Sequence, residues 1–176
     1  MTRRIVLTGP EASGKTTLAA ALARHFRSPW LPEQARAYAV EVKRALTLDD
    51  VEPIARRTIA AEDLKLAANP PLILLDTDLI STVVYSRHYY GSCAAWIETQ
   101  ARARRGDLYL LCRPDLPWES DGVRDRPAQR EELFALFDAA LAEFGCTASE
   151  VAGKGMIRER AALSAANALI AAAGHA

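Results

Sequence analysis

The stretch GPEASGKTT, residues 9–17, follows the apolar run 5–7 and decides the fold. It matches G-x-x-x-x-G-K-[ST] at every constrained position, and that pattern describes a glycine-rich loop whose backbone N–H groups surround a phosphate chain. A strand that turns sharply into a helix needs a residue with unusual backbone angles, which Gly9 provides. Gly14 has no side chain to keep an anion from the helix N-terminus. The stretch therefore predicts a site for the phosphates of a nucleotide.

The remaining residues of this loop divide into backbone and side-chain contacts. Residues 10–13 are expected to direct backbone N–H groups at the ligand. Lys15 can reach the β- and γ-phosphates, and the Thr16 hydroxyl can bind Mg²⁺. A strand over residues 3–8 and apolar residues at helical spacing after the loop give the order that this motif requires. The predicted nucleotide contacts in the loop are Gly9, Glu11, Ala12, Ser13, Gly14, Lys15, Thr16 and Thr17.

Composition restricts the class of protein. The chain has 176 residues, with 22 Lys and Arg against 22 Asp and Glu, so its net charge gives no general attraction to nucleic acid or to an anionic membrane. No apolar stretch is long enough to span a membrane and no signal-peptide pattern is present, so we expect a cytoplasmic protein. Cys93, Cys112 and Cys146 contain no C-x-x-C pattern, which favours free thiols over disulfides or a zinc site.

Short apolar runs alternate with long helical segments, which is the pattern of βαβ units around a parallel sheet. The predicted fold is α/β: a three-layer P-loop NTPase fold with a five-stranded parallel sheet, helices on both faces and a short Arg-rich lid at about residues 117–130. We expect a single domain over residues 1–176. Asp50 is placed to cap a helix that continues to about Asn69, and segment 159–173 predicts a last helix. The predicted strands are 3–8, a weak one near 29–33, 72–76, 107–112 and 147–152.

An acidic pair follows the third predicted strand. LILLDTD, residues 72–78, places Asp76 and Asp78 at the carboxyl edge of the sheet, where ligands bind in open α/β folds. An aspartate there can hold the magnesium shell, directly or through water. We expect Asp76 to serve the metal together with Thr16. Asp78 stays open between a substrate contact and the cap of the helix that begins near Leu79.

An arginine-rich loop precedes the next helix. PWESDGVRDRPAQR, residues 117–130, contains Arg124, Arg126 and Arg130. Arginines that fold over a nucleotide neutralise charge on the transferring phosphoryl group, so this segment is a candidate lid. The alternative is a solvated loop whose arginines pair with neighbouring carboxylates. We expect Arg124 and Arg130 to act in catalysis and Arg126 to bind the nucleotide.

Glu33 and Arg36 follow the weak second strand, in LPEQARAYAV. Glu33 is the leading candidate to accept a proton from an attacking hydroxyl, with Asp78 as the rival. Arg36 could orient the substrate or an acid, and a surface ion pair is the alternative for both residues. The predicted catalytic residues are thus Lys15, Glu33, Asp78, Arg124 and Arg130.

Several motifs run in a fixed order along the chain: GPEASGKTT, PEQARAYAV, LLDTDLISTVVYS with YYG, and DLYLLCRPDLPWESDGVRD followed by QREELF. In this order they resemble the kinase domain of the NadR family of bacterial ribosylnicotinamide kinases. The resemblance covers nearly the whole chain, and DTDxxxT (76–82) with PWxxDGxR (117–124) is far more specific than the P-loop alone.

The resemblance implies a P-loop kinase that transfers the ATP γ-phosphate to the ribose 5-hydroxyl of nicotinamide riboside, giving nicotinamide mononucleotide. It places Glu33 and Asp78 on the substrate side and Arg124 and Arg130 in the lid. It also implies that ATP and magnesium are held by Gly14, Lys15, Thr16 and Thr17.

The chain also departs from the family. Pro32 stands where the family has an aromatic residue, and the lid is slightly shorter between Arg124 and Arg130. Both changes touch the acceptor side, so another nucleoside-like or sugar acceptor stays open beside nicotinamide riboside. The adenylyltransferase and DNA-binding regions that precede the kinase in multifunctional members are absent, so we expect a stand-alone kinase-like domain.

Other nucleotide-binding classes make different demands on the sequence. A GTPase switch predicts N-K-x-D, which the chain does not contain. A regulatory ATP-binding protein or binding module would keep the P-loop and need no acceptor-side base. The expected partners are ATP, Mg²⁺ and a small-molecule acceptor, without nucleic acid or membrane. The preference between ATP and GTP and the oligomeric state stay open.

Overall fold

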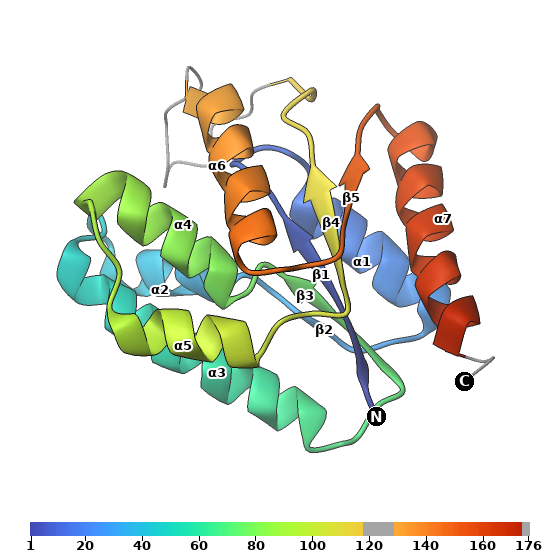
Figure 1. Ribbon diagram of the computed structural model, residues 1–176, viewed down its shortest axis with the longest axis horizontal. Helices are drawn as coiled ribbons and strands as arrows, with labels where there is room; N and C mark the ends of the chain where they lie inside the picture. The colour runs from blue at the N-terminus through green and yellow to red at the C-terminus, as the bar shows by residue number, and fades with distance from the viewer. Residues whose placement is uncertain (118–128, 174–176) are drawn as a thin grey trace.

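A sheet of five parallel strands lies between two layers of helices in the computed structural model of this protein (Figure 1). The structure describes residues 1–117 and 129–173. The strands lie in the order β2-β3-β1-β4-β5, which confirms the predicted three-layer α/β fold. They are β1 (Arg3–Thr8), β2 (Trp30–Leu31), β3 (Leu72–Asp76), β4 (Leu108–Cys112) and β5 (Ala148–Val151). The helices are α1 (Lys15–Phe26), α2 (Gln34–Val42), α3 (Val51–Leu66), α4 (Leu79–Tyr90), α5 (Ala95–Ala103), α6 (Arg130–Glu143) and α7 (Met156–Ala173), with a short 3₁₀ turn η1 (Leu48–Asp50).

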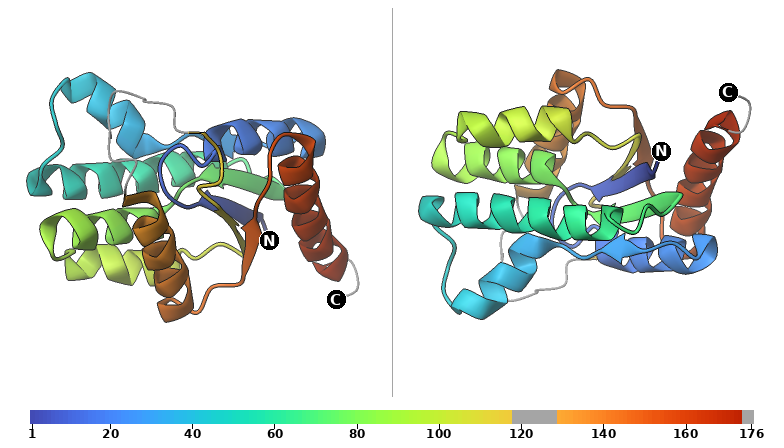
Figure 2. Two further views of the ribbon diagram at one scale, coloured as in Figure 1. Left: turned by 90° about the horizontal axis from the view of Figure 1, so that it is seen from above. Right: turned by 90° about the horizontal axis from the view of Figure 1, so that it is seen from below.

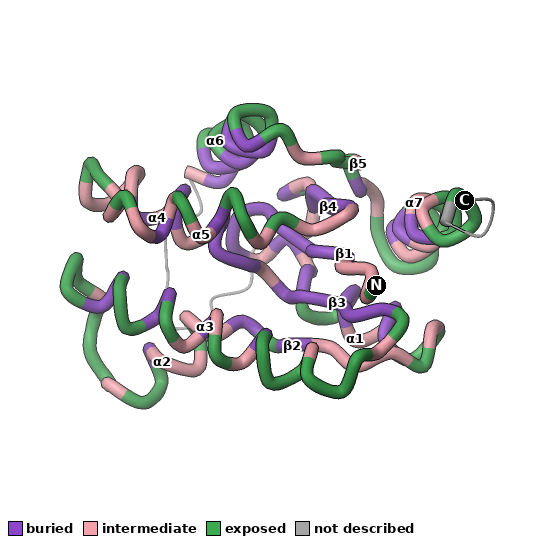
Figure 3. Tube along the Cα trace, turned by 60° about the horizontal axis from the view of Figure 1, so that its bottom comes forward, coloured by how far each residue is buried: buried purple, intermediate pink, exposed green. Residues whose placement is uncertain are grey.

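Each face of the sheet has its own hydrophobic core. Helices α1 and α7 cover one face, and α3 to α6 cover the other (Figure 2). Neighbouring residues of β1 point to opposite faces, so Ile5 and Leu7 join the first core and Val6 joins the second. Because both faces are covered, the central strands are apolar almost throughout and lie buried between helices whose outer sides are exposed (Figure 3). No helix of the described residues is long and apolar enough to cross a membrane.

β2 and α3 are both shorter than predicted. β2 is limited to residues 30–31, because Pro29 and Pro32 on either side lack the N–H group that a ladder requires. Helix α3 ends at Leu66, before the expected end near Asn69, since Asn69 takes a left-handed φ of 48° and closes a turn onto the Leu66 carbonyl.

The parallel pairing brings three segments to one edge of the sheet. Leu7 pairs with Asp76 of β3 on one side and with Leu110 of β4 on the other. The loop after β1, the end of β3 and the segment after β4 therefore leave the sheet side by side. This edge is where open α/β folds bind their ligands.

Gly9, the first residue after β1, lies against the neighbouring strand. Its φ is 129°, which side-chain-bearing residues rarely adopt, and a Cβ atom there would lie 2.6 Å from the Cys112 carbonyl oxygen. Both the backbone angle and the close approach require glycine. Gly91, at the end of α4, has a φ of 77° but open space around its Cα.

We expect Gly9→Ala to reduce the free energy of unfolding by about 3 kcal/mol, because backbone strain and a steric clash add. Gly91→Ala is the matched control and should lose only about 1 kcal/mol, since it incurs the backbone cost alone. Urea denaturation followed by circular dichroism measures both. Equal losses for the two variants would contradict the close packing of Gly9 on β4.

Candidate active site

The loop of residues 9–14 connects β1 to α1 at the carboxyl edge of the sheet. Besides Gly9, its backbone takes positive φ at Ala12 (51°) and Gly14 (80°). Gly14 immediately precedes α1, and a Cβ atom there would lie 2.8 Å from Leu116 Cδ1. The loop thus turns tightly at the N-terminus of a helix, where unpaired N–H groups and the helix dipole favour an anion.

Two side chains bind the Pro10 carbonyl, and one of them brings a positive charge to the N-terminus of α1. The Pro10 carbonyl accepts hydrogen bonds from Ser13 Oγ at 2.8 Å and from Lys15 Nζ at 2.7 Å. The Lys15 ammonium therefore lies against the loop, and only 8% of the residue is exposed. Glu11 is also buried, whereas Thr17 is exposed in the first turn of α1. A full positive charge thus adds to the partial charge of the helix N-terminus.

The predicted metal pair forms a direct contact. Thr16 Oγ1 donates a hydrogen bond of 2.6 Å to Asp76 Oδ2. Asp76 is 1% exposed, and its Oδ1 finds no hydrogen-bond partner among the described residues. Burial raises the pKa of Asp76, and the charge of Lys15 partly offsets this effect. The site therefore contains a buried carboxylate oxygen that can still accept a ligand.

Hydroxyl and carboxylate oxygens are the ligand type that Mg²⁺ takes. In the described part of the chain, no group of three or more His, Cys, Asp or Glu could hold a metal. Mg²⁺ commonly uses one or two protein ligands and completes its shell with phosphate and water. Thr16 and Asp76 therefore fit the ion.

Glu33 lies between β2 and α2. Because β2 and β1 flank β3 on opposite sides, Glu33 and the phosphate loop follow strands on opposite sides of Asp76. It is 8% exposed, and its Oε2 lies 3.7 Å from Nε of Arg36, one helical turn later. The charge of Glu33 raises the pKa of Asp76 and the charge of Arg36 lowers it, so both residues act on the same edge of the sheet. The structure brings Glu33 together with Lys15 and Asp76.

Asp78 is held in a different way, as the cap of α4. Its Oδ1 accepts from the Ile80 N–H at 3.0 Å, and its Oδ2 accepts from the Tyr109 hydroxyl at 2.6 Å. That hydroxyl in turn accepts from the Gly106 N–H at 3.1 Å. Burial raises the pKa of Asp78 to about 6, and the hydrogen bond from Tyr109 opposes part of that rise. Both carboxylate oxygens are thus engaged in structural contacts.

A cavity of about 840 Å³ adjoins Glu33 and Asp78. It is lined by α2, the following segment 43–47, α3 and α4. Tyr85 and Tyr89 of α4 line it, with their rings stacked at a centroid distance of 5.9 Å. The volume lies within the range of small-molecule pockets, about 300 to 1,000 Å³. The cavity can hold a molecule of nucleoside size with an aromatic surface beside it.

Asp50 anchors one wall of this cavity. It is 2% exposed and accepts from the Tyr38 hydroxyl at 2.9 Å, from two Arg44 nitrogens at 2.6 and 2.8 Å, and from the Thr47 N–H and hydroxyl at 2.8 and 3.0 Å. The Arg44 guanidinium holds the pKa of Asp50 well below its usual range. Asp50 occupies the N-cap position of α3, as predicted, but its side chain makes no capping hydrogen bond to that helix, because the carboxylate reaches back to Thr47. No sequence pattern indicated its role in the wall.

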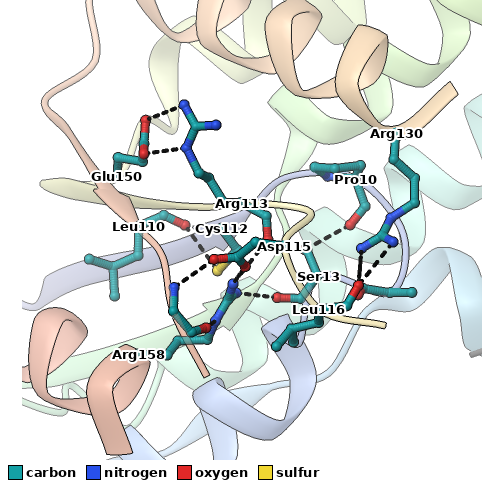
Figure 4. Close-up of polar contacts among 12 residues, drawn as sticks. Pro10, Ser13, Leu110, Cys112, Arg113, Asp115, Leu116, Arg130, Glu150 and Arg158 are labelled. Carbon is teal, nitrogen blue, oxygen red and sulfur yellow. Dashed lines mark hydrogen bonds and ion pairs between the residues drawn. The ribbon is translucent and has the colours of Figure 1, made fainter. Parts of the chain in front are cut away.

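Two arginines from distant parts of the chain reach the phosphate loop (Figure 4). Arg130 begins α6, is 8% exposed, and donates to the Ala12 carbonyl at 3.1 Å and to the Leu116 carbonyl at 3.1 and 3.2 Å. Arg158 of α7 donates to the Ser13 carbonyl at 2.5 Å, and no sequence pattern indicated it. The predicted lid residues Arg124 and Arg126 lie outside the described residues.

The loop, the Thr16–Asp76 contact and the adjoining cavity define a P-loop nucleotide-binding protein with a kinase-like fold. The chain belongs to the AAA domain family, whose sequence profile matches residues 4–160. The trifunctional NAD biosynthesis/regulator protein NadR of *Salmonella typhimurium* is 28% identical over 126 residues. NadR of *Escherichia coli* K12 matches at the same identity and length. The aligned region is 69% of this chain and 31% of either NadR, so the chain spans about a third of these relatives.

Solved structures extend this likeness to the fold. A NadR protein in complex with NR has a TM-score of 0.78 at 25% identity, covering 96% of this chain and 51% of that one. A NadR protein with NAD and AMP-PNP has a TM-score of 0.75 at 23% identity, over 96% and 49%. Deoxyadenosine kinase from *M. mycoides* shares the fold at a TM-score of 0.58 and 14% identity, over 94% and 99%. The resemblance to NadR kinases is thus confirmed.

We expect Asp78→Asn to remove a pH-dependent part of the stability. Because the pKa of Asp78 is about 6 in the folded chain and 3.8 ordinarily, its contribution is present below about pH 4 and is lost as the pH rises through 6. The stability of Asp78→Asn relative to the natural chain should therefore be about 1 kcal/mol more favourable at pH 8 than at pH 5.

Urea unfolding at the two pH values measures this difference. Asp138→Asn, which changes an exposed carboxylate of α6, is the control and should show no such trend. An Asp78→Asn difference that is constant with pH would show that burial does not perturb the carboxyl group.

Proposed function

We propose that this chain is an ATP-dependent kinase that transfers the γ-phosphate to a hydroxyl of a nucleoside-like acceptor. The first acceptor to consider is nicotinamide riboside, with nicotinamide mononucleotide as product. The observation that carries the proposal is the cavity beside Glu33, which opens at the same sheet edge as the phosphate loop. The likeness to NadR, one structure of which contains NR, supports this choice of acceptor.

The phosphate side of the site binds the donor. Backbone N–H groups of the loop and the Lys15 ammonium would hold the phosphate chain of ATP, with Thr17 and Arg126 as further contacts. Thr16 and Asp76 would hold Mg²⁺, which when bound would neutralise charge on the phosphate oxygens. Arg124 and Arg130 would add positive charge from the segment that follows β4.

The acceptor side supplies the nucleophile. A hydroxyl of the acceptor in the cavity gives its proton to the Glu33 carboxylate as its oxygen bonds to the γ-phosphorus. The bond from that phosphorus to the bridging oxygen breaks, and ADP leaves with the electron pair. Arg36 would orient Glu33 from one turn away. Asp78 is the weaker candidate for the base because both of its oxygens already accept hydrogen bonds.

The proposal predicts that ADP release from MgATP increases strongly when the right acceptor is added, because both substrates are needed to assemble the site. A coupled assay over a panel of ribosides and sugars, with nicotinamide riboside first, measures this dependence. Lys15→Ala should remove the activity and keep the fold. Slow ADP release that no acceptor increases would contradict the kinase and favour a regulatory nucleotide-binding protein.

We expect Glu33→Gln to lower kcat by about 100-fold or more, because glutamine keeps the size of the side chain and cannot accept the proton. Glu41→Gln is the matched control, since Glu41 is an exposed glutamate of α2, the helix that follows Glu33, and pairs with Arg57. Steady-state kinetics with saturating acceptor compare the two variants. If Glu33→Gln stays active and Asp78→Asn does not, the base is Asp78.

A further inference from the structure

Arg158 is a buried arginine in the first turn of α7 that the proposed reaction does not use. It is only 4% exposed. Its guanidinium lies where three segments meet: the phosphate loop, residues 113–116 after β4, and the turn 152–155 between β5 and α7 (Figure 4). A charge taken out of water at this depth needs several partners.

Those partners come from all three segments. Nη1 donates to the Ser13 carbonyl at 2.5 Å, Nε to the Gly153 carbonyl at 2.8 Å, and Nη2 to the Arg113 carbonyl at 3.0 Å and to the Asp115 carboxylate. Asp115 also accepts from the Gly153 N–H at 2.6 Å, which closes the network. The planar fork of one guanidinium thus bonds to all three segments at once.

The hydrogen bond to the Ser13 carbonyl also sets the direction of the next backbone N–H group. In a trans peptide the C=O and the following N–H point in opposite directions. Since the Ser13 carbonyl faces Arg158, the N–H of Gly14 points away from it. Arg130 has the same relation to the preceding peptide, because it binds the Ala12 carbonyl. The two arginines therefore fix the directions of the successive N–H groups of Ser13 and Gly14.

We propose that Arg158 is a positioning residue of the nucleotide site. By holding the Ser13 carbonyl it directs the Gly14 N–H at the phosphates, and through Asp115 and Arg113 it ties the phosphate loop to the segment that leads toward residues 117–130. This role rests on the nucleotide-binding part of the proposed function and does not depend on which acceptor is used.

The test is Arg158→Lys, which keeps the charge and loses the fork that bonds three segments at once. Calorimetric titration of the full chain with AMP-PNP and Mg²⁺ should give a Kd raised by about tenfold or more, the effect of losing a charge-assisted contact. With an active acceptor, KM for ATP should rise in parallel, while KM for the acceptor changes by less than about twofold.

Arg160→Lys is the control, because Arg160 is an exposed arginine of the same helix, and its Kd should equal that of the natural chain. Asp115→Asn should weaken AMP-PNP binding in the same direction as Arg158→Lys. If Arg158→Lys does not fold, Asp115→Asn tests the proposal in its place. This substitution is milder, because 34% of the Asp115 side chain is exposed.

A lower melting temperature with an unchanged Kd in these variants would make Arg158 purely structural and overturn the proposal. A natural chain that does not bind AMP-PNP would overturn it as well, together with the kinase. A natural chain that binds AMP-PNP and phosphorylates no acceptor would contradict only the kinase and leave the test of Arg158 valid.

Discussion

Three carbonyl groups of the phosphate loop each accept a hydrogen bond from a cationic side chain, and the shape of the loop depends on these contacts. A loop that offers N–H groups to an anion must turn its carbonyl oxygens elsewhere, where they need donors. Here the donors are charged, so they also add positive potential around the anion. They come from three helices that only the folded sheet brings together. The pairs are Lys15 with Pro10, Arg130 with Ala12 and Arg158 with Ser13.

The cavity lies beside the phosphate loop at the same sheet edge and has a different lining. Around the cavity, α2, α3 and α4 supply aromatic and apolar side chains, and the buried carboxylates of Glu33 and Asp76 lie between this side and the loop. Burial raises the pKa of Asp76, while Lys15 favours its charged form, so neighbouring charge partly offsets the cost of burial.

Local patterns were enough to predict the succession of strands and helices along the chain, the phosphate loop, and Thr16 and Asp76 as a pair that serves one metal ion. These features follow from short-range signals: glycine spacing, apolar runs and an aspartate at a strand end. The contact of Arg158 with Ser13 spans 145 positions, and that of Tyr109 with Asp78 spans 31. Such contacts depend on how helices pack on the sheet, so no local pattern reveals them. The contacts of Asp50 with Tyr38 and Arg44 span only 12 and 6 positions, but they depend on how the chain folds back between α2 and α3, which no motif indicated.

The wall of the cavity at residues 43–47 is held by the carboxylate of Asp50 and by the Asp50 N–H, which donates to the Thr47 carbonyl, and it belongs to no strand of the described sheet. Substitutions in this segment should therefore have little effect on the phosphate-binding half of the molecule. The other four positions of this segment could be exchanged, with Arg44 and Asp50 kept, so that the cavity takes a molecule of another shape while the phosphate loop stays the same. Proteins that bind different small molecules could then differ in this one short segment and share the same phosphate-binding site.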